Sequence, residues 1–334
     1  MQEAMYYEQL DEQLVRCHLC PHNCKIKPGR LGICRARENR DGVLYSLNYG
    51  QITSWNVDPI EKKPLYHYYP GRNIFSVGTF GCNFHCGFCQ NWEIAHGESP
   101  VTREITTDAL VEIALEAENK SGSIGIAYTY SEPMIWYEFV YDTAKTAHQK
   151  GLKNVLVTNG FVQKEPLQEL LPFVDAMNID VKSFTDDFYR KTCGGRLEPV
   201  LKTVELAQKS CHVELTNLVV PGMNDSDQEI TDLVDWIASL DPGIPLHFSR
   251  YFPCYQFDKP PTPLETLARV LEIARKKLKY VYIGNAWEMN ENDTFCPRCG
   301  NLLIKRFGYG VDIKGLEGNK CLNCGHETRV VVGN

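Results

Sequence analysis

The stretch FSVGTFGCNFHCGFC, residues 75–89, joins a short apolar run to three cysteines. The run Phe75–Phe80 predicts a β-strand that ends at Gly81, because it is short, apolar and bounded by a turn residue. Cys82, Cys86 and Cys89 follow directly in the pattern C-x3-C-x2-C. Three thiolates are one fewer than saturate an ordinary iron–sulfur cluster or a structural zinc, so a four-iron cluster here would keep one iron open for chemistry.

A zinc knuckle is the alternative interpretation of this motif. It would need a fourth ligand, and His85 or His96 would have to supply it. His85 lies inside the x3 gap between two of the cysteines, where its ring is poorly placed to bind the same metal ion. We therefore favour the open cluster.

Strands and helices alternate after this stretch. Five further strands are predicted, at Ile124–Tyr130, Asn154–Gly160, Ala176–Val181, Val213–Val220 and Leu246–Tyr251. Helical patterns occupy Thr106–Lys120, with Thr107 as a candidate cap, and also Ile135–Lys150, Pro166–Leu171, Pro199–Lys209, Ser226–Ser239 and Pro263–Lys277. This alternation predicts a parallel α/β sheet, doubly wound or a complete or partial barrel, with functional groups at the carboxyl ends of the strands. Tyr280–Gly284 is a candidate for one more strand.

Composition narrows the class of protein. The chain has 334 residues, a net charge of −7 and 14 cysteines. Its acidic balance argues against wholesale nucleic-acid binding, although seven basic residues lie between Arg16 and Arg40. The polar start, Met1 to Val15, is unlike a signal peptide, and no apolar run is long enough to span a membrane. We therefore expect a cytoplasmic protein whose cysteines bind metals rather than form disulfides.

Two more cysteine clusters flank the central one. Cys296, Cys299, Cys321 and Cys324 form two C-x2-C-G knuckles, which predict a zinc ribbon, with a rubredoxin-like iron as the minor alternative. Cys17, Cys20, Cys24 and Cys34 supply four thiolates within a turn-rich segment, for which we favour structural zinc over an auxiliary iron–sulfur cluster. The predicted domains are residues 1–72 (N-terminal cysteine module and linking arm), 73–292 (barrel) and 293–334 (ribbon).

The central motif after a first βα strand resembles that of the radical S-adenosylmethionine (SAM) superfamily. The resemblance implies a partial (β/α)6 barrel in which Cys82, Cys86 and Cys89 hold a [4Fe–4S] cluster whose open iron binds SAM. Reductive cleavage of SAM would then give a 5′-deoxyadenosyl radical that abstracts hydrogen from a substrate. It also implies that Phe88 lies against the adenine of SAM.

Later strand ends extend the resemblance to the SAM-binding residues. It implies contacts from Ser131 and Glu132, which replace the usual Gly-Gly-Glu stretch, and from the pairs Thr158–Asn159 and Asp180–Lys182. Each has a structural alternative. Phe88 could be a packing aromatic, Glu132 could cap the helix at Pro133, and Asp180–Lys182 could be an ordinary salt bridge. His247 could face the substrate or be a core histidine.

Nearly the whole chain is similar to one subfamily, the radical SAM enzyme of the AmmeMemoRadiSam system, related to pyruvate formate-lyase activating enzymes. The matching stretches include HLCPHNC (18–24), NVDPIEKKPL (56–65), GCNFHC (81–86) and CQNWE (89–93). This resemblance implies Memo-like and AMMECR1-like partners and a low-potential electron donor of the flavodoxin or ferredoxin type. The substrate stays open, and it could be a protein side chain. The segment Asn56–Tyr69 could cross the barrel mouth or wrap the core.

A hypothesis of a different class also remains at this point. The three cysteine clusters could belong to a non-catalytic multi-zinc adaptor that binds protein or nucleic acid. The incomplete cysteine set and the polar residues at several strand ends favour the enzyme, because an adaptor has no need of them.

Overall fold

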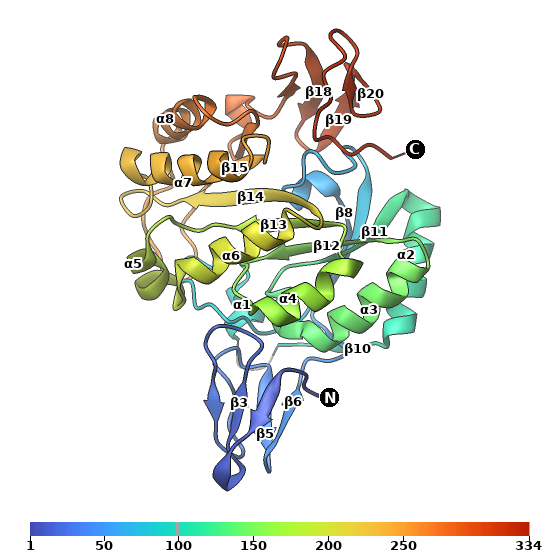
Figure 1. Cartoon of the computed structure of the whole chain (residues 1–334), viewed down its shortest axis with the longest axis vertical. Helices are drawn as coiled ribbons and strands as arrows, with labels where there is room; N and C mark the ends of the chain where they lie inside the picture. The colour runs from blue at the N-terminus through green and yellow to red at the C-terminus, as the bar shows by residue number, and fades with distance from the viewer. Residues whose placement is uncertain (98–99, 334) are drawn as a thin grey trace.

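The computed structural model describes residues 1–97 and 100–333. Its centre is a sheet in the order β16-β15-β14-β13-β12-β11-β9-β8 (Figure 1). The bounds are β8 Ser54–Pro59, β9 Asn73–Gly78, β11 Ser123–Tyr128, β12 Lys153–Thr158, β13 Ala176–Asp180, β14 His212–Val219, β15 Leu246–Arg250 and β16 Val281–Gly284. All neighbours in the sheet are parallel except β8, which pairs antiparallel with β9.

Helices link the parallel strands and cover the sheet (Figure 1). They are α1 Trp92–His96, α2 Thr107–Ser121, α3 Tyr137–Gln149, α4 Lys164–Leu170, α5 Asp186–Phe188, α6 Leu197–Ala207, α7 Asp227–Leu240 and α8 Leu264–Arg275. The six long helical patterns and the six strands of the sequence are thus confirmed, and Tyr280–Gly284 supplies a seventh parallel strand. One detail was wrong. The cap of α2 is Thr106, whose hydroxyl accepts the Ala109 amide hydrogen, whereas Thr107 is the first helical residue.

The sheet is open, because in the described part of the chain β8 and β16 pair only with their inner neighbours. Apolar side chains on both faces explain the near-continuous burial of β11 and β13. The result is the α/β fold with a parallel sheet and an incomplete barrel, as predicted.

The segment after β8 closes the amino-terminal end of the barrel. Ile60, Leu65 and Tyr68 are buried against the first residues of the sheet strands, such as Ile74 and Ala176. Asn56–Tyr69 therefore wraps the core and does not cross the barrel mouth at the carboxyl ends of the strands.

His247 belongs to this same end of the barrel. Its Nε2 lies 2.6 Å from a carboxylate oxygen of Glu214, and both side chains are buried. Glu214 also accepts the backbone N–H groups of Tyr66 and His67. His247 is accordingly a satisfied core histidine.

Small antiparallel modules lie at opposite ends of the molecule (Figure 1). The N-terminal one contains β1 Gln2–Glu3, β2 Tyr7–Gln9, β3 Val15–Cys17, β4 Lys25–Ile26, β5 Arg37–Arg40, β6 Val43–Ser46 and β7 Gln51–Ile52, which pairs with β10 Arg103–Glu104. The C-terminal one contains β17 Thr294–Phe295, β18 Leu302–Phe307, β19 Gly310–Ile313, β20 Leu316–Glu317 and β21 Lys320–Cys321. The three-domain division remains a prediction.

Short 3-10 segments occur at Asp11–Gln13, Ile60–Lys62, Pro133–Trp136, Leu171–Phe173 and Trp287–Met289, and a π-helical turn occurs at Tyr189–Cys193. Across the described residues, every helix is too short or too polar to cross a lipid bilayer.

Candidate functional site

The three central cysteines lie on a loop at the carboxyl end of β9. Gly81 makes the turn into this loop with φ +90°, and a Cβ there would lie 2.7 Å from the carbonyl oxygen of Cys34. The loop is fixed further on by the backbone N–H of His85, which donates to the Cys193 carbonyl at 2.7 Å. Cys86 is buried, and Cys82 and Cys89 are half-buried.

Within the described residues, the central cysteines do not form a compact metal-ligand group with a histidine. Among the residues that the structure describes, only the C-terminal cysteines bring three or more ligand atoms within 4.8 Å of one another. Neither His85 nor His96 therefore completes a compact zinc site with the central cysteines; the two imidazoles stack on each other, with centroids 5.0 Å apart. The zinc-knuckle interpretation receives no support.

The Cys82 sulfur has hydrogen-bond donors on two sides. The Phe84 backbone N–H lies 3.4 Å away, and the Asn159 side-chain amide lies 3.7 Å away. Burial raises the pKa of the Cys82 thiol, and the carboxylate of Glu132 raises it further. A thiolate at this position would accept hydrogen bonds from these two N–H groups.

Glu132 is buried at the carboxyl end of β11. One of its carboxylate oxygens accepts the Thr158 hydroxyl at 2.6 Å and the Met134 N–H at 2.9 Å. The other accepts the Asn159 N–H at 2.8 Å. The helix-cap interpretation of Glu132 is therefore confirmed, and the same carboxylate also binds the end of β12. Burial raises its pKa to about 7, although these three hydrogen bonds act in the opposite direction.

Asp180 and Lys182 form an ion pair of 2.8 Å at the carboxyl end of β13. The salt-bridge interpretation of this pair is thus confirmed. The Lys182 ammonium also lies 6.0 Å from the centre of the Phe88 ring. A hydrogen bond with Cys193 lowers the pKa of the Cys86 thiol, and the charge of Lys182 lowers it further. Phe88 is buried between Phe188 and Phe257, so it also packs as an ordinary aromatic side chain.

All of the predicted SAM-binding side chains come from the same edge of the sheet. Ser131 is the most peripheral of them, since its hydroxyl donates to the Thr79 carbonyl at 2.6 Å. The carboxyl ends of β9, β11, β12 and β13 therefore bring together three thiols, two carboxyl groups and an ammonium group. This is the placement that the sequence predicted.

Two residues of this edge were missed from the sequence. Asn83 links the cysteine loop to β12, because its Oδ1 accepts the Asn159 side-chain amide at 2.8 Å. Cys193 was seen as a lone cysteine, but it is buried, and its hydrogen bond lowers the pKa of Cys86. Asn83 could have been found from the sequence, because it directly follows the first cysteine of the motif. Cys193 could not, because only the fold brings it to the cysteine loop.

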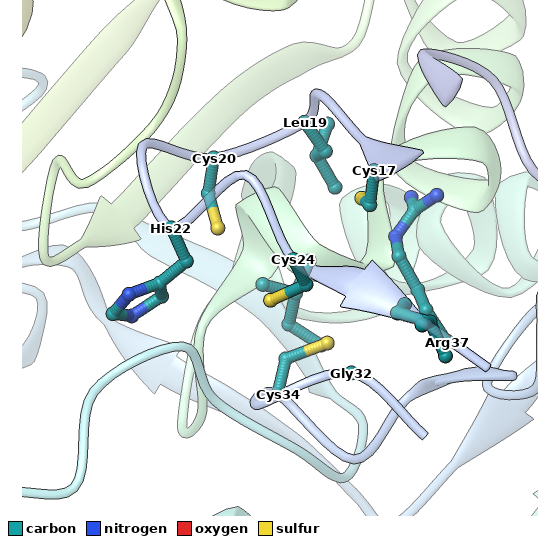
Figure 2. A pocket seen from close by; sticks show the side chains of 10 residues that line it. Cys17, Leu19, Cys20, His22, Cys24, Gly32, Cys34 and Arg37 are labelled. Atoms are coloured by element: carbon teal, nitrogen blue, oxygen red, sulfur yellow. The ribbon is translucent and has the colours of Figure 1, made fainter. Parts of the chain in front are cut away.

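The four N-terminal cysteines surround a small pocket that is completed by Ile135 of the 3-10 segment Pro133–Trp136 (Figure 2). Cys17, Cys20, Cys24 and Cys34 line this pocket together with Leu19, Ile26, His22 and Arg37. The predicted ligands are thus brought together. Burial raises the pKa of Cys34 to about 11, although the nearby Arg37 guanidinium lowers it.

The four C-terminal cysteines form a compact group. Sulfur separations are 3.6 Å for Cys296–Cys324 and 3.7 Å for Cys299–Cys321, and all four ligand atoms lie within 4.8 Å. Gly300 and Gly325 make the two knuckle turns in the left-handed region, with φ +72° and +68°. This geometry fits one tetrahedral metal ion, in agreement with the predicted ribbon.

Comparison with known proteins agrees with this geometry. The sequence profile of the Radical SAM superfamily matches residues 76–236. An uncharacterized protein of Methanocaldococcus jannaschii, MJ0808, is 46% identical over 341 residues, covering 99% of this chain and 100% of that protein. The pyruvate formate-lyase 1-activating enzyme of Escherichia coli is 32% identical over 168 residues, covering 48% of this chain and 66% of that enzyme.

The solved structure of Streptococcus suis SuiB bound to S-adenosylmethionine shares the fold. It has a TM-score of 0.53 and 14% identity, over 70% of this chain and 55% of SuiB. The parallel sheet, the cysteine loop after β9 and these comparisons agree with one another. The chain carries a radical SAM domain homologous to the pyruvate formate-lyase activating enzymes, and it is an enzyme of the radical SAM type.

Proposed function

We propose that Cys82, Cys86 and Cys89 hold a [4Fe–4S] cluster, the cofactor that the radical SAM family implies together with SAM. Such a cluster, with one iron open to SAM, supplies the electron that splits the sulfonium and yields a 5′-deoxyadenosyl radical for hydrogen abstraction. The observation that carries the proposal is the meeting of the three thiols with Glu132 and Lys182 at one sheet edge.

The polar residues around the thiols would orient SAM. Glu132 keeps a buried carboxylate next to Cys82, so its ionised form would attract the SAM ammonium group. Lys182 offers a cation, and Asp180 an acceptor, for the remaining polar groups of SAM. Phe88 offers an apolar ring for the adenine. Thr158 and Asn159 hold Glu132 in place through the hydrogen bonds described above, and they and Ser131, whose hydroxyl donates to the Thr79 carbonyl, are proposed as further contacts to SAM.

The hydrogen donor is proposed to be a protein side chain. Support comes from the similarity to a protein that is named as an activating enzyme of pyruvate formate-lyase. The longer matching stretches of the sequence favour the AmmeMemoRadiSam system, with Memo-like and AMMECR1-like proteins as partners. A flavodoxin or ferredoxin would supply the electron. The eleven cysteines in the three clusters favour a protein that acts in the reducing environment of the cytoplasm.

The C-terminal ribbon is proposed to hold zinc. Its compact sulfur tetrad matches the geometry of a closed four-thiolate zinc site, which cross-links a small module and carries out no chemistry. The four N-terminal cysteines are proposed as a second closed metal site. The multi-zinc adaptor, our earlier alternative, finds no support in the comparisons, which point to an enzyme.

Anaerobic SAM cleavage tests the proposed function. The full chain is reconstituted with iron and sulfide, reduced with dithionite and mixed with SAM, and 5′-deoxyadenosine is measured by chromatography. The wild type should release 5′-deoxyadenosine, and Cys82→Ala should lose this activity. Cys211→Ala is the matched control, because Cys211 lies outside the three clusters. Equal release from the wild type and Cys82→Ala would overturn the proposal.

A further inference from the structure

Tyr130 has an unusual backbone conformation, directly before the proposed SAM contacts Ser131 and Glu132. Its φ is +71°, in the left-handed region that residues other than glycine rarely adopt. The Ser131 N–H donates to the Thr129 carbonyl at 3.0 Å, so Tyr130 is the central residue of a γ-turn with the positive φ of the rare, strained form. Such strain persists only where the surrounding contacts enforce it, and it is concentrated at functional sites.

A buried carboxylate anchors the Tyr130 side chain. The Tyr130 hydroxyl donates to Asp58 of β8 at 2.8 Å, and Lys62 and Lys63 donate to the same carboxylate at 3.0 and 2.7 Å. The Lys63 ammonium also lies 4.8 Å from the centre of the Tyr130 ring. Burial would raise the pKa of Asp58, but these hydrogen bonds lower it overall, so the anchor is ionised.

Two further contacts hold the backbone of the turn. The side-chain amide of Asn91, two residues after Cys89 of the cysteine loop, donates to the Tyr130 carbonyl at 2.7 Å. On β9, a Cβ at Gly78 would lie 2.5 Å from the Thr129 carbonyl oxygen and 3.0 Å from the Tyr130 Cβ. Only glycine therefore fits beside the turn. Contacts from β8, β9 and the cysteine loop thus converge on Tyr130.

The turn sets the path of the chain into the SAM contacts. Ser131 and Glu132 follow Tyr130 directly, so a change in the Tyr130 backbone angles moves both side chains. Glu132 must also reach its donors Thr158 and Asn159 on the neighbouring strand, at 2.6 and 2.8 Å. A turn that relaxed to an unstrained conformation would carry the Glu132 carboxylate away from this place.

We infer that Tyr130 is a positioning residue for SAM, because its strained turn aims Ser131 and Glu132 at the bound molecule. The inference rests on the proposed function, since it takes Glu132 as a SAM contact. Asp58 lies 72 positions earlier in the chain and anchors the turn through the Tyr130 hydroxyl. The antiparallel strand β8 therefore has a task in the SAM site beyond extending the sheet.

SAM binding by the iron-loaded full chain tests the inference. Tyr130→Phe keeps the ring but loses the bond to the ionised Asp58, so the turn relaxes and the SAM dissociation constant, measured anaerobically at about pH 8, should rise about tenfold. Tyr128→Phe is the matched control, because it removes a phenolic hydrogen bond from β11, to Asn154 at 3.2 Å, and leaves the turn intact. Its dissociation constant should equal that of the wild type. Equal constants for Tyr130→Phe and the wild type would overturn the inference.

A double-mutant cycle separates positioning from a general loss of stability. In a Glu132→Gln background, adding Tyr130→Phe should raise the SAM dissociation constant by no more than about twofold, because the turn then positions a side chain that no longer attracts the SAM ammonium. A tenfold rise in this background as well would show that Tyr130 does not act through Glu132.

Gly78→Ala disturbs the same turn from β9. The added Cβ meets the Thr129 carbonyl oxygen, so SAM binding should weaken as in Tyr130→Phe while the iron content stays at the wild-type level. Unchanged SAM binding at unchanged iron content would contradict the inference. The wild type distinguishes the two levels of the account. If it does not bind SAM, the proposed function fails and this inference with it; if it binds SAM no better than Tyr130→Phe does, only the inference fails.

Discussion

Arg37 in the N-terminal module and Glu138 in α3 form a buried ion pair between residues 101 positions apart in the chain. Both carboxylate oxygens lie 2.8 Å from the same guanidinium nitrogen. The exposed fractions of the two side chains are 1% and 3%. This pair fastens the cysteine module to the barrel next to the central loop.

Glu138→Gln should destabilise the chain by about 3 kcal/mol, because it leaves the Arg37 charge buried without its counter-ion. Urea unfolding followed by circular dichroism measures this change. Glu116→Gln, which removes the exposed partner of Lys120, is the control and should leave the unfolding midpoint unchanged. Equal midpoints for Glu138→Gln and the wild type would show that the pair does not fasten the module.

Glu132 should make SAM binding depend on pH. Burial raises its pKa to about 7, so its carboxylate ionises between pH 6 and 8 and only then attracts the SAM ammonium. The SAM dissociation constant should fall severalfold over this range, and Glu132→Gln should bind weakly at every pH. Anaerobic calorimetry measures both. A pH dependence that survives in Glu132→Gln would assign the titration to another group.

The same raised pKa has a consequence for stability. A carboxyl group whose pKa is higher in the folded chain than its ordinary value of 4.5 favours folding at low pH. This contribution of Glu132 should be fully present below about pH 4.5 and should decline as the pH rises to about 7. The free energy of unfolding of Glu132→Gln should therefore vary less with pH than that of the wild type over this window.

His247 should matter for stability and not for SAM cleavage. His247→Ala removes one hydrogen bond from the buried Glu214, which should cost about 1–3 kcal/mol. The yield of 5′-deoxyadenosine per bound cluster should stay at the wild-type level, because His247 lies at the amino-terminal end of the barrel. A lost yield at unchanged iron content would place His247 in the reaction instead.

Cys296→Ser should remove the metal of the ribbon alone. The variant should lose one zinc per chain and hydrogen-exchange protection in β18 and β19, while 5′-deoxyadenosine release continues. The ribbon should stay attached, since the buried Arg306 donates to the Tyr66 carbonyl at 2.6 Å. Loss of SAM cleavage in this variant would show that the ribbon supports the catalytic site.

The sequence predicted the elements of the barrel closely for a physical reason. Buried parallel strands are short apolar runs bounded by turn residues, so their ends moved by only one or two positions, as in Asn154–Gly160 against β12. Because parallel strands share one carboxyl edge, the grouping of Cys82, Glu132 and Lys182 was also predictable.

Contacts between distant segments could not be predicted in this way. The approach of Cys193 to Cys86, the Arg37–Glu138 pair and the antiparallel addition of β8 to the sheet all depend on how separate elements pack. Spacing in the sequence also could not show how closely the four C-terminal sulfurs approach one another in space.

The most direct test of the account is the yield of 5′-deoxyadenosine from the reduced, iron-loaded full chain, compared with Cys82→Ala under the same conditions. The account predicts a brown protein that cleaves SAM and a Cys82→Ala variant that does not, while Cys211→Ala behaves like the wild type. A colourless wild type that binds only zinc and leaves SAM intact after reconstitution would contradict it.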